Sequence, residues 1–280
     1  MAVGVQRSVS LFRKVVALPQ EHGTWAFLLS PLFIGLAAGG RWTVETAMLV
    51  LGVLVAFFLR QPIVILVKVL SGRKPRTLFY PALFWIGVYG TLGLLILVWF
   101  WLRGMGYLLY LALPALAVFV WHLYLVHRRA ERGQREVEIV ASGALALAAP
   151  AALWVARGYP DPMGWLLWLL AWFQSAASIV YAYVRLEQRR WSRWPSLSAR
   201  LRAGWRALLY TTFNVIAVAV LGFLGLVSPW LWLAYALQWG ETVWGVLRPA
   251  VGWRPTRIGF RQLVVSGLFT LVFILTFSLG

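Results

Sequence analysis

Apolar residues gather into nine runs of about 20 residues, and polar residues collect in the short connections between them. A helix of about 20 apolar residues crosses a bilayer core of about 30 Å. Each run therefore predicts a membrane-spanning helix, and the whole pattern predicts an all-α polytopic bundle that forms one domain over residues 1–280. The nine predicted spans lie near residues 24–40, 45–66, 79–101, 105–126, 137–156, 163–184, 206–226, 229–247 and 259–279.

Basic residues alternate from one connection to the next. Twenty-two of the 26 Lys and Arg residues lie in the amino-terminal tail, residues 1–20, in the second, fourth, sixth and eighth connections, or in the first turn of the span that follows, as Arg206 and Arg261 do. The other connections hold Arg41, Arg103 and Arg157. Because cytoplasmic loops attract Lys and Arg, this alternation predicts a multi-pass protein of the cell membrane with a cytoplasmic amino terminus and an external carboxyl terminus.

The composition supports a membrane protein and excludes several other classes. The chain is 61% hydrophobic, with a formal charge of +18 and 12% charged residues, about half the fraction usual in a soluble domain. Its basic residues lie in short loops, where they contact anionic lipid head groups, so no nucleic-acid partner is expected. The absence of Cys excludes disulfides and thiol nucleophiles. The sixth connection, residues 185–205, is basic and rich in Trp, which predicts an amphipathic segment on the cytoplasmic leaflet.

Ionisable groups near the ends of the spans are the first candidates for a functional site, because charge within a membrane is costly. Glu21 and His22 stand where the chain begins its first span, and they suit pairing, cation binding or proton transfer; a polar helix start is the alternative. Arg60 and Gln61 lie in the second span, and Lys68 follows eight residues after Arg60 on the same side of the helix. These cations suit a buried anion or carboxylate, or simple snorkelling to the interface.

Further polar residues mark the fifth and sixth spans. Glu138 and Ser142 are four residues apart and share a helical face, where Glu138 suits either an ion pair with an arginine or a ligand. On the sixth span a polar stripe runs along one face and must meet protein or water. It consists of Gln174, Ser178, Tyr181 and Arg185, and the helix exit adds Glu187 and Arg189. Residues Asn214, Gln238 and Glu241 on later spans are expected to close the same cavity.

Small residues and prolines predict two features of the packing. The run from Ala141 to Ala152 is the best candidate for close helix packing. Within it, Pro150 is one of four prolines inside spans that can kink a helix and free a carbonyl, the others being Pro31, Pro62 and Pro114.

Three motifs resemble the YwiC-like family of bacterial membrane proteins. They are Pro19-Gln20-Glu21-His22-Gly23-Thr24-Trp25-Ala26 at the first span, Arg60-Gln61-Pro62 in the second and Tyr183-Val184-Arg185 at the end of the sixth. The resemblance runs over most of the chain.

More distantly, nine helices with large basic connections after the second and sixth spans resemble the UbiA superfamily of intramembrane prenyltransferases. That resemblance implies two Asp-rich motifs that hold magnesium against an isoprenoid diphosphate. Here the only Asp is Asp161, on the opposite side, and the sixth-span position retains only Glu187. Magnesium requires oxygen ligands, which these two positions largely lack, so no metal site is predicted. No other cofactor is predicted either.

These features suggest a metal-independent site for an isoprenoid, a quinone or a lipid head group, because arginine can bind phosphate bidentately. Arg60, Lys68, Arg185 and Arg189 would hold the anion. Glu21, His22 and Glu138 would orient an acceptor or carry a proton. A small-anion or proton-coupled transporter and a non-catalytic accessory subunit are the alternatives, and the sequence leaves open whether any reaction is catalysed.

Overall fold

A computed structural model describes residues 11–19, 22–130 and 133–279. These described residues form helices and contain no β-strand, which confirms the predicted all-α class. In chain order the helices are α1 (Lys14–Ala17), α2 (His22–Gly39), α3 (Val44–Leu70), α4 (Phe79–Leu102), α5 (Leu109–Arg128), α6 (Arg135–Ala146), α7 (Ala148–Arg157), α8 (Pro162–Gln188), α9 (Leu197–Phe223), α10 (Trp232–Leu247) and α11 (Pro255–Phe277). Two 3-10 turns, η1 (Arg76–Leu78) and η2 (Gly106–Leu108), precede α4 and α5.

Every predicted span coincides with helical structure. Among the described residues, seven helical segments are long and apolar enough to cross a membrane: α3, α4, α5, α6 with α7, α8, α9 and α11. The two other predicted spans coincide with α2 and α10, which are shorter, at 18 and 16 residues. The chain is therefore a polytopic bundle of apolar helices.

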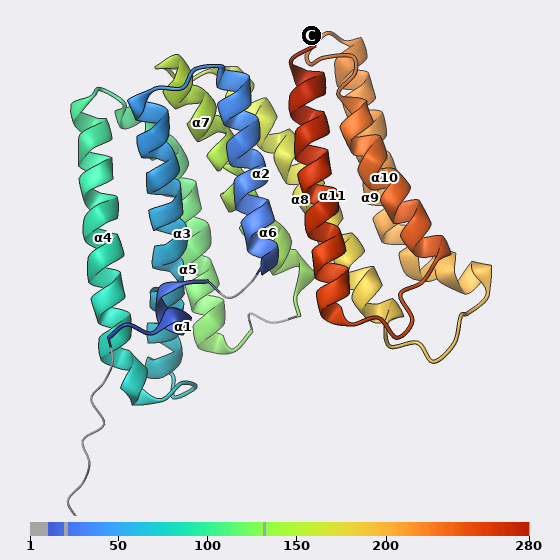
Figure 1. Cartoon of the computed structure of the whole chain (residues 1–280), viewed down its shortest axis with the longest axis horizontal. Coiled ribbons are helices and arrows are strands. Elements are labelled where there is room, and N and C mark those ends of the chain that lie inside the picture. Colours follow the sequence, from blue (N-terminus) through green and yellow to red (C-terminus); the bar gives the residue numbers. More distant parts are fainter. Residues whose placement is uncertain (1–10, 20–21, 131–132, 280) are drawn as a thin grey trace, which may run out of the picture.

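The helices run up and down, so successive connections lie at opposite ends of the bundle. Figure 1 shows α1 and the connections that follow α3, α5, α8 and α10 at the lower end, and the carboxyl terminus at the upper end. The lower connections are those that the sequence predicts to share one side of the membrane on account of their Lys and Arg content. We call this end of the bundle the basic end.

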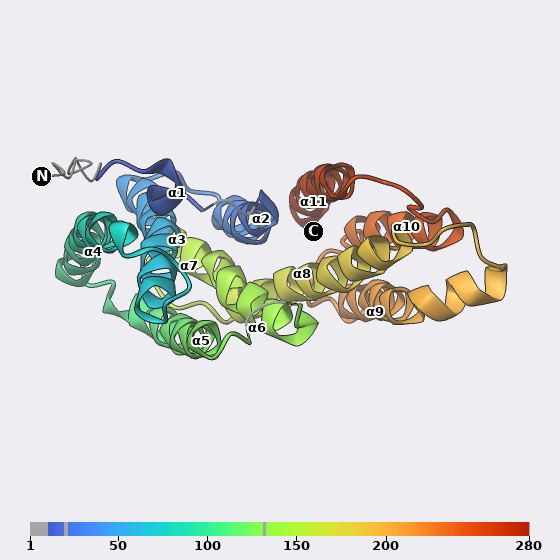
Figure 2. The ribbon, with the colours of Figure 1, turned by 90° about the horizontal axis from the view of Figure 1, so that it is seen from below.

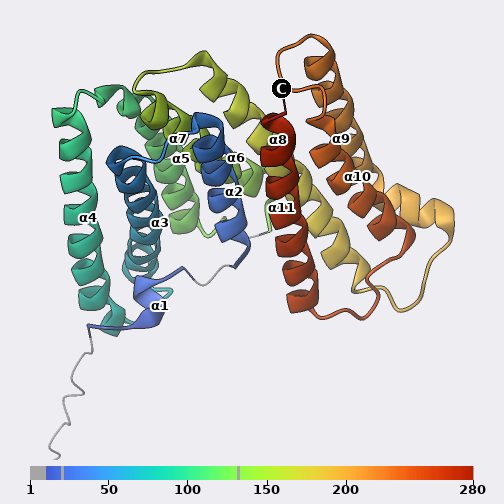
Figure 3. The same cartoon turned by 45° about the horizontal axis from the view of Figure 1, so that its top comes forward.

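Helix α2 joins the two sides of the molecule. Seen from below, α3, α4 and α5 lie toward one side and α9 and α10 toward the other, with α2, α7, α8 and α11 between them (Figure 2). Helix α2 packs against both α7 and α11, and the tilted view shows it beside α11 (Figure 3). There Thr270 Oγ1 donates a hydrogen bond of 2.6 Å to Ser30 Oγ, which links segments 240 residues apart.

Small residues let α2 and α7 approach closely. Gly35 and Gly39 of α2 face Ala149, Ala152 and Ala156 of α7, and a Cβ on Gly35 would clash with the carbonyl of Ala149. Small residues at this spacing bring helix backbones together in membranes, where van der Waals packing drives association. The close packing predicted for the run Ala141–Ala152 is confirmed.

Pro150 divides the fifth predicted span into α6 and α7. Proline has no N–H to donate to the carbonyl four residues earlier, and its ring clashes with that carbonyl. At the break, Leu147 N donates to Ala144 O and not to Gly143 O, four residues earlier, and Trp168 Nε1 donates to this freed Gly143 O at 2.9 Å. A side chain of α8 therefore satisfies the break. The other three prolines of the spans lie inside the continuous helices α2, α3 and α5.

The connection predicted at residues 185–205 is shorter in the structure. Helix α8 continues to Gln188, because Arg185 and Gln188 are buried against α10, and α9 begins at Leu197, where Ser196 caps the helix. Residues 189–196 alone connect the two helices. Trp205, expected in the connection, lies on α9.

Replacing Gly35 with Leu should destabilise the bundle by about 1–3 kcal/mol, since the larger side chain must push α2 away from α7. Thermal unfolding in a mild detergent measures the loss. Gly87→Leu on α4 is the matched control, because a Cβ at Gly87 meets no atom within 4 Å. Equal unfolding temperatures for the two variants would contradict the close α2–α7 contact.

Candidate functional site

The polar stripe of α8 faces α10 and is satisfied there by hydrogen bonds between the two helices. Ser178 Oγ accepts from Gln174 Nε2 at 3.1 Å and from Gln238 Nε2 at 2.7 Å. Gln238 Nε2 also donates to Gln174 O at 3.2 Å. The expected partners Gln238 and Glu241 do meet the stripe, whereas Asn214 bonds Phe173 O. This face of α8 therefore meets protein.

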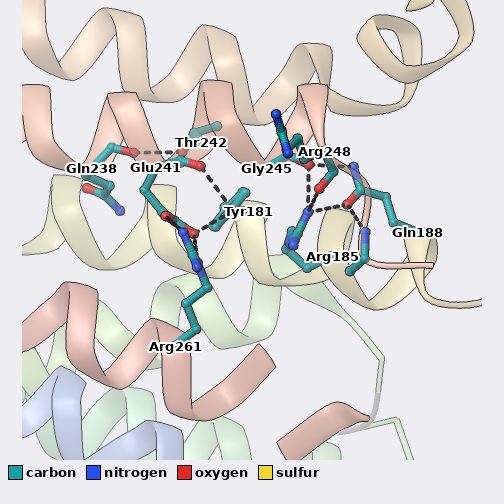
Figure 4. A network of polar contacts seen from close by, with 10 residues as sticks. Tyr181, Arg185, Gln188, Gln238, Glu241, Thr242, Gly245, Arg248 and Arg261 are labelled. Atoms are coloured by element: carbon teal, nitrogen blue, oxygen red, sulfur yellow. Dashed lines mark hydrogen bonds and ion pairs between the residues drawn. The ribbon is translucent and has the colours of Figure 1, made fainter. Parts of the chain in front are cut away.

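Arg185 closes the carboxyl end of α10. The residue is 1% exposed, and its Nη1 donates to Gly245 O at 2.6 Å, Arg248 O at 2.8 Å and Gln188 Oε1 at 2.8 Å (Figure 4). Gly245 O lacks its regular helical partner, because the residue four positions on is Pro249, which has no N–H. A cation at this end of a helix also complements the helix dipole. The guanidinium thus supplies the donors that the backbone lacks.

Glycine makes this contact close. A Cβ on Gly245 would clash with the ring of Tyr181, so only glycine allows α8 and α10 to approach there. Aromatic rings complete the surroundings of the Arg185 guanidinium, with Trp253 at 4.9 Å and Trp244 at 5.5 Å from their ring centres. Its Nη2 is buried and has no hydrogen-bond partner among the described residues.

One turn of α10 from Gly245, Glu241 forms a bidentate ion pair with α11. Arg261 Nε donates to Oε1 at 2.6 Å and Arg261 Nη2 donates to Oε2 at 2.7 Å. The Tyr181 hydroxyl donates to the same Oε1 at 2.9 Å (Figure 4). The Arg261 guanidinium lies 3.8 Å from the centre of the Trp244 ring. Both oxygens of this partly buried carboxylate are thereby paired, which lowers the cost of a charge between apolar helices.

Two hollows lie beside this network. The first, of about 590 Å³, is at the turn between α10 and α11. It is lined by Gly252, Trp253, Arg254, Thr256, Arg257 and Phe260. The Arg257 guanidinium stacks 4.1 Å from the Trp253 ring centre. We call this hollow the turn pocket.

The second hollow, of about 430 Å³, lies between α10 and α11 themselves. It is lined by Leu237, Gly240, Glu241, Trp244, Arg261, Val264, Val265 and Leu268. We call it the α10–α11 groove.

The structure places the predicted anion-holding cations on two separate groups of helices. Arg60 and Lys68 lie on α3, which packs against α4, α5 and α7. Arg185 and Arg189 lie at the end of α8 and bond the turn between α10 and α11, where Arg189 Nε donates to Trp253 O at 3.3 Å. In Figure 2, α7 lies between α3 and α8.

The other predicted residues are dispersed. Gln61 Nε2 donates to Val15 O at 3.0 Å and ties α3 to α1, while Ser142 Oγ donates to Ile139 O within α6. Glu138 Oε1 accepts from the Tyr183 hydroxyl at 2.8 Å, and Glu187 is exposed. Glu21 lies outside the described residues, and of His22 the structure describes only the backbone, at the start of α2.

The Glu241–Arg261 pair and the turn pocket were not predicted from the sequence. Arg254, Arg257 and Arg261 are spaced by three and four residues and so share a face of α11, a signal that was available. No sequence signal identifies Glu241 as the partner of Arg261, because Glu241 belongs to another helix. Within the described parts of the chain, no three His, Asp or Glu side chains gather closely enough to hold a metal ion.

Comparison with known proteins agrees with the resemblance carried by the motifs of the first and second spans. Residues 18–153 match the family model described as YwiC-like protein. Over these residues the chain is similar to the YwiC-like family. A relative from Bacillus subtilis (strain 168), described as "Uncharacterized protein YwiC", is 26% identical over 213 residues, which cover 69% of this chain and 81% of the relative. Because 69% of the chain is more than residues 1–153 contain, the likeness extends beyond residue 153.

No solved structure matches this chain. The distant resemblance to the UbiA superfamily therefore stays a prediction.

Glu241→Gln and Arg261→Gln should each destabilise the protein, and the double variant should lose less than the sum of the two. Each single change leaves one charge of a partly buried pair without its partner, and the expected coupling is about 0.5–3 kcal/mol. Unfolding of all four proteins in the same detergent measures it. Additive losses would show that the pair contributes no coupling.

Proposed function

We propose that this multi-pass membrane protein binds an anionic head group, of an isoprenoid, a quinone precursor or a phospholipid, in the turn pocket at its basic end and without magnesium. The observation that carries the proposal is the grouping of Arg254, Arg257 and Trp253 around one hollow at the start of α11. In this proposal the basic end faces the cytoplasm, where Lys and Arg are enriched in loops.

The chemistry of the turn pocket suits phosphate. A guanidinium offers paired N–H donors that match two phosphate oxygens, and it keeps its charge at any physiological pH. The Thr256 hydroxyl adds a donor, and the first turn of α11 presents the positive end of the helix dipole. Because arginine supplies the positive charge, binding of the anion needs no metal.

Stacking prepares Arg257 for this role. Its guanidinium already lies on the Trp253 ring, so the Arg257 side chain loses less conformational entropy when the anion binds. Trp253 is in turn held by the end of α8, because the Arg185 guanidinium lies against its ring and Arg189 Nε donates to its backbone carbonyl. In this proposal Arg185 and Arg189 position the pocket and do not themselves clamp the anion.

Removing the two cations that line the pocket should remove the ligand. Native mass spectrometry of protein purified in mild detergent should find an anionic lipid on the wild type and lose it in the double variant Arg254→Gln, Arg257→Gln. The matched control is Arg190→Gln, Arg193→Gln, which removes the same charge from exposed positions at the same end of the bundle. Millimolar magnesium should leave the bound fraction unchanged.

Lipid that persists equally in both double variants would place binding outside the turn pocket. A bound fraction that rises steeply with magnesium would contradict the metal-independent chemistry.

The proposed orientation has a direct test, because the chain contains no Cys. Ser71→Cys in the connection after α3 should resist a membrane-impermeant maleimide in intact cells and react once the membrane is opened. Gly104→Cys in the connection after α4 should react in intact cells. The opposite pattern would invert the orientation.

A further inference from the structure

The turn pocket and the α10–α11 groove are aligned on one face of α11. Arg257, Arg261 and Leu268 recur at spacings of four and seven residues, which keeps them on the same side of a helix. Arg257 lines the turn pocket, and Arg261 and Leu268 line the groove. The two hollows therefore follow each other along α11 from its beginning into the bundle.

The chemistry of the walls changes along this path. The turn pocket is lined by cations, a hydroxyl and aromatic rings, whereas the far part of the groove is lined by Leu237, Val264, Val265 and Leu268. Val264 and Leu268 are 45% and 46% exposed, so the apolar walls open onto the surface that the bilayer covers. A polar end followed by an apolar channel matches an amphiphile that lies in the membrane.

Glu241 neutralises the positive charge of Arg261 in the α10–α11 groove. Its bidentate bond to Arg261 neutralises that guanidinium, whereas Arg254 and Arg257 of the turn pocket form no ion pair with any carboxylate in the described part of the chain. Arg261 lies six residues into α11, a rise of roughly 9 Å at 1.5 Å per residue.

Gly240 leaves the floor of the groove open. It lines the groove, and a Cβ built there would meet no atom within 4 Å. A chain of methylene groups would therefore contact the α10 backbone at this position without displacing a side chain.

We infer that the site takes a phospholipid-like ligand whose phosphate binds Arg254 and Arg257 and whose hydrocarbon chain occupies the α10–α11 groove, entering sideways from the bilayer. This inference rests on the proposed function, because it assumes the head-group site in the turn pocket. It adds that the hydrocarbon chain is recognised, which a free phosphate or a water-soluble phosphate ester would not satisfy.

Filling the groove tests the inference. Gly240→Leu places a side chain in the open floor, and Val264→Trp fills the same groove from α11. Each should weaken binding of long-chain phosphatidic acid in detergent by roughly tenfold or more, since displacing even two methylenes from an apolar wall has about that effect. Gly267→Leu is the matched control, because Gly267 is exposed on α11 outside the groove and its Cβ also meets open space.

Glycerol phosphate, which has the phosphate but no chain, is the second probe and should bind at least tenfold more weakly than phosphatidic acid to the wild type. Wild-type affinity for phosphatidic acid in both filled variants would overturn the groove inference, as would equal affinity for the two probes.

The double variant Arg254→Gln, Arg257→Gln separates this failure from that of the proposed function. If it loses phosphatidic acid while the filled variants keep it, the head-group site stands and the groove is not used. If it keeps wild-type affinity, the turn pocket is not the site and both proposals fail.

Discussion

The guanidinium of Arg185 holds the end of α10, and the candidate site depends on that contact. Pro249 has no N–H, so the carbonyl of Gly245 lacks a backbone hydrogen-bond donor. Between apolar helices, water cannot replace that donor. Arg185 and Gln188 of α8 both bond that carbonyl, and Arg189 bonds the following turn at Trp253. The turn between α10 and α11 is therefore built on the end of α8.

Other polar groups inside the bundle are also paired by side chains. Glu241 is paired with Arg261 and Tyr181, Ser178 with Gln238, and the carbonyl freed at the α6–α7 break with Trp168. Each of these contacts joins two helices. Polar groups thus determine which helices are neighbours, because an unpaired polar group would cost several kcal/mol in the apolar phase.

Packing of small residues supplies the complementary contribution. Gly35 and Gly39 bring α2 against the alanines of α7, and on its other side α2 meets α11 through Ser30 and Thr270. Helix α2 therefore links α11, which belongs to the candidate site, to α7, against which α3 with Arg60 and Lys68 packs. The four cations predicted to hold one anion therefore lie in two parts of the molecule, Arg60 and Lys68 on α3 and Arg185 and Arg189 at the end of α8.

The sequence by itself determined the helical class, the position of each span, the alternation of basic connections and the polar stripe of α8. Those features are local, because an apolar run of about 20 residues satisfies its own backbone as a helix and residues three or four apart share a face. The small-residue run and Pro150 likewise act on their own helix and its nearest contact.

Only the tertiary structure decided which polar groups meet. Arg185 was a candidate for an anion, yet it binds the carbonyls of α10, and the Glu241–Arg261 pair joins helices whose rotation about their axes no local pattern records. Such pairings depend on how far each helix is turned and shifted against its neighbours. That is set by the packing of the entire bundle, so the groove between α10 and α11 could be recognised only once the helices were in place.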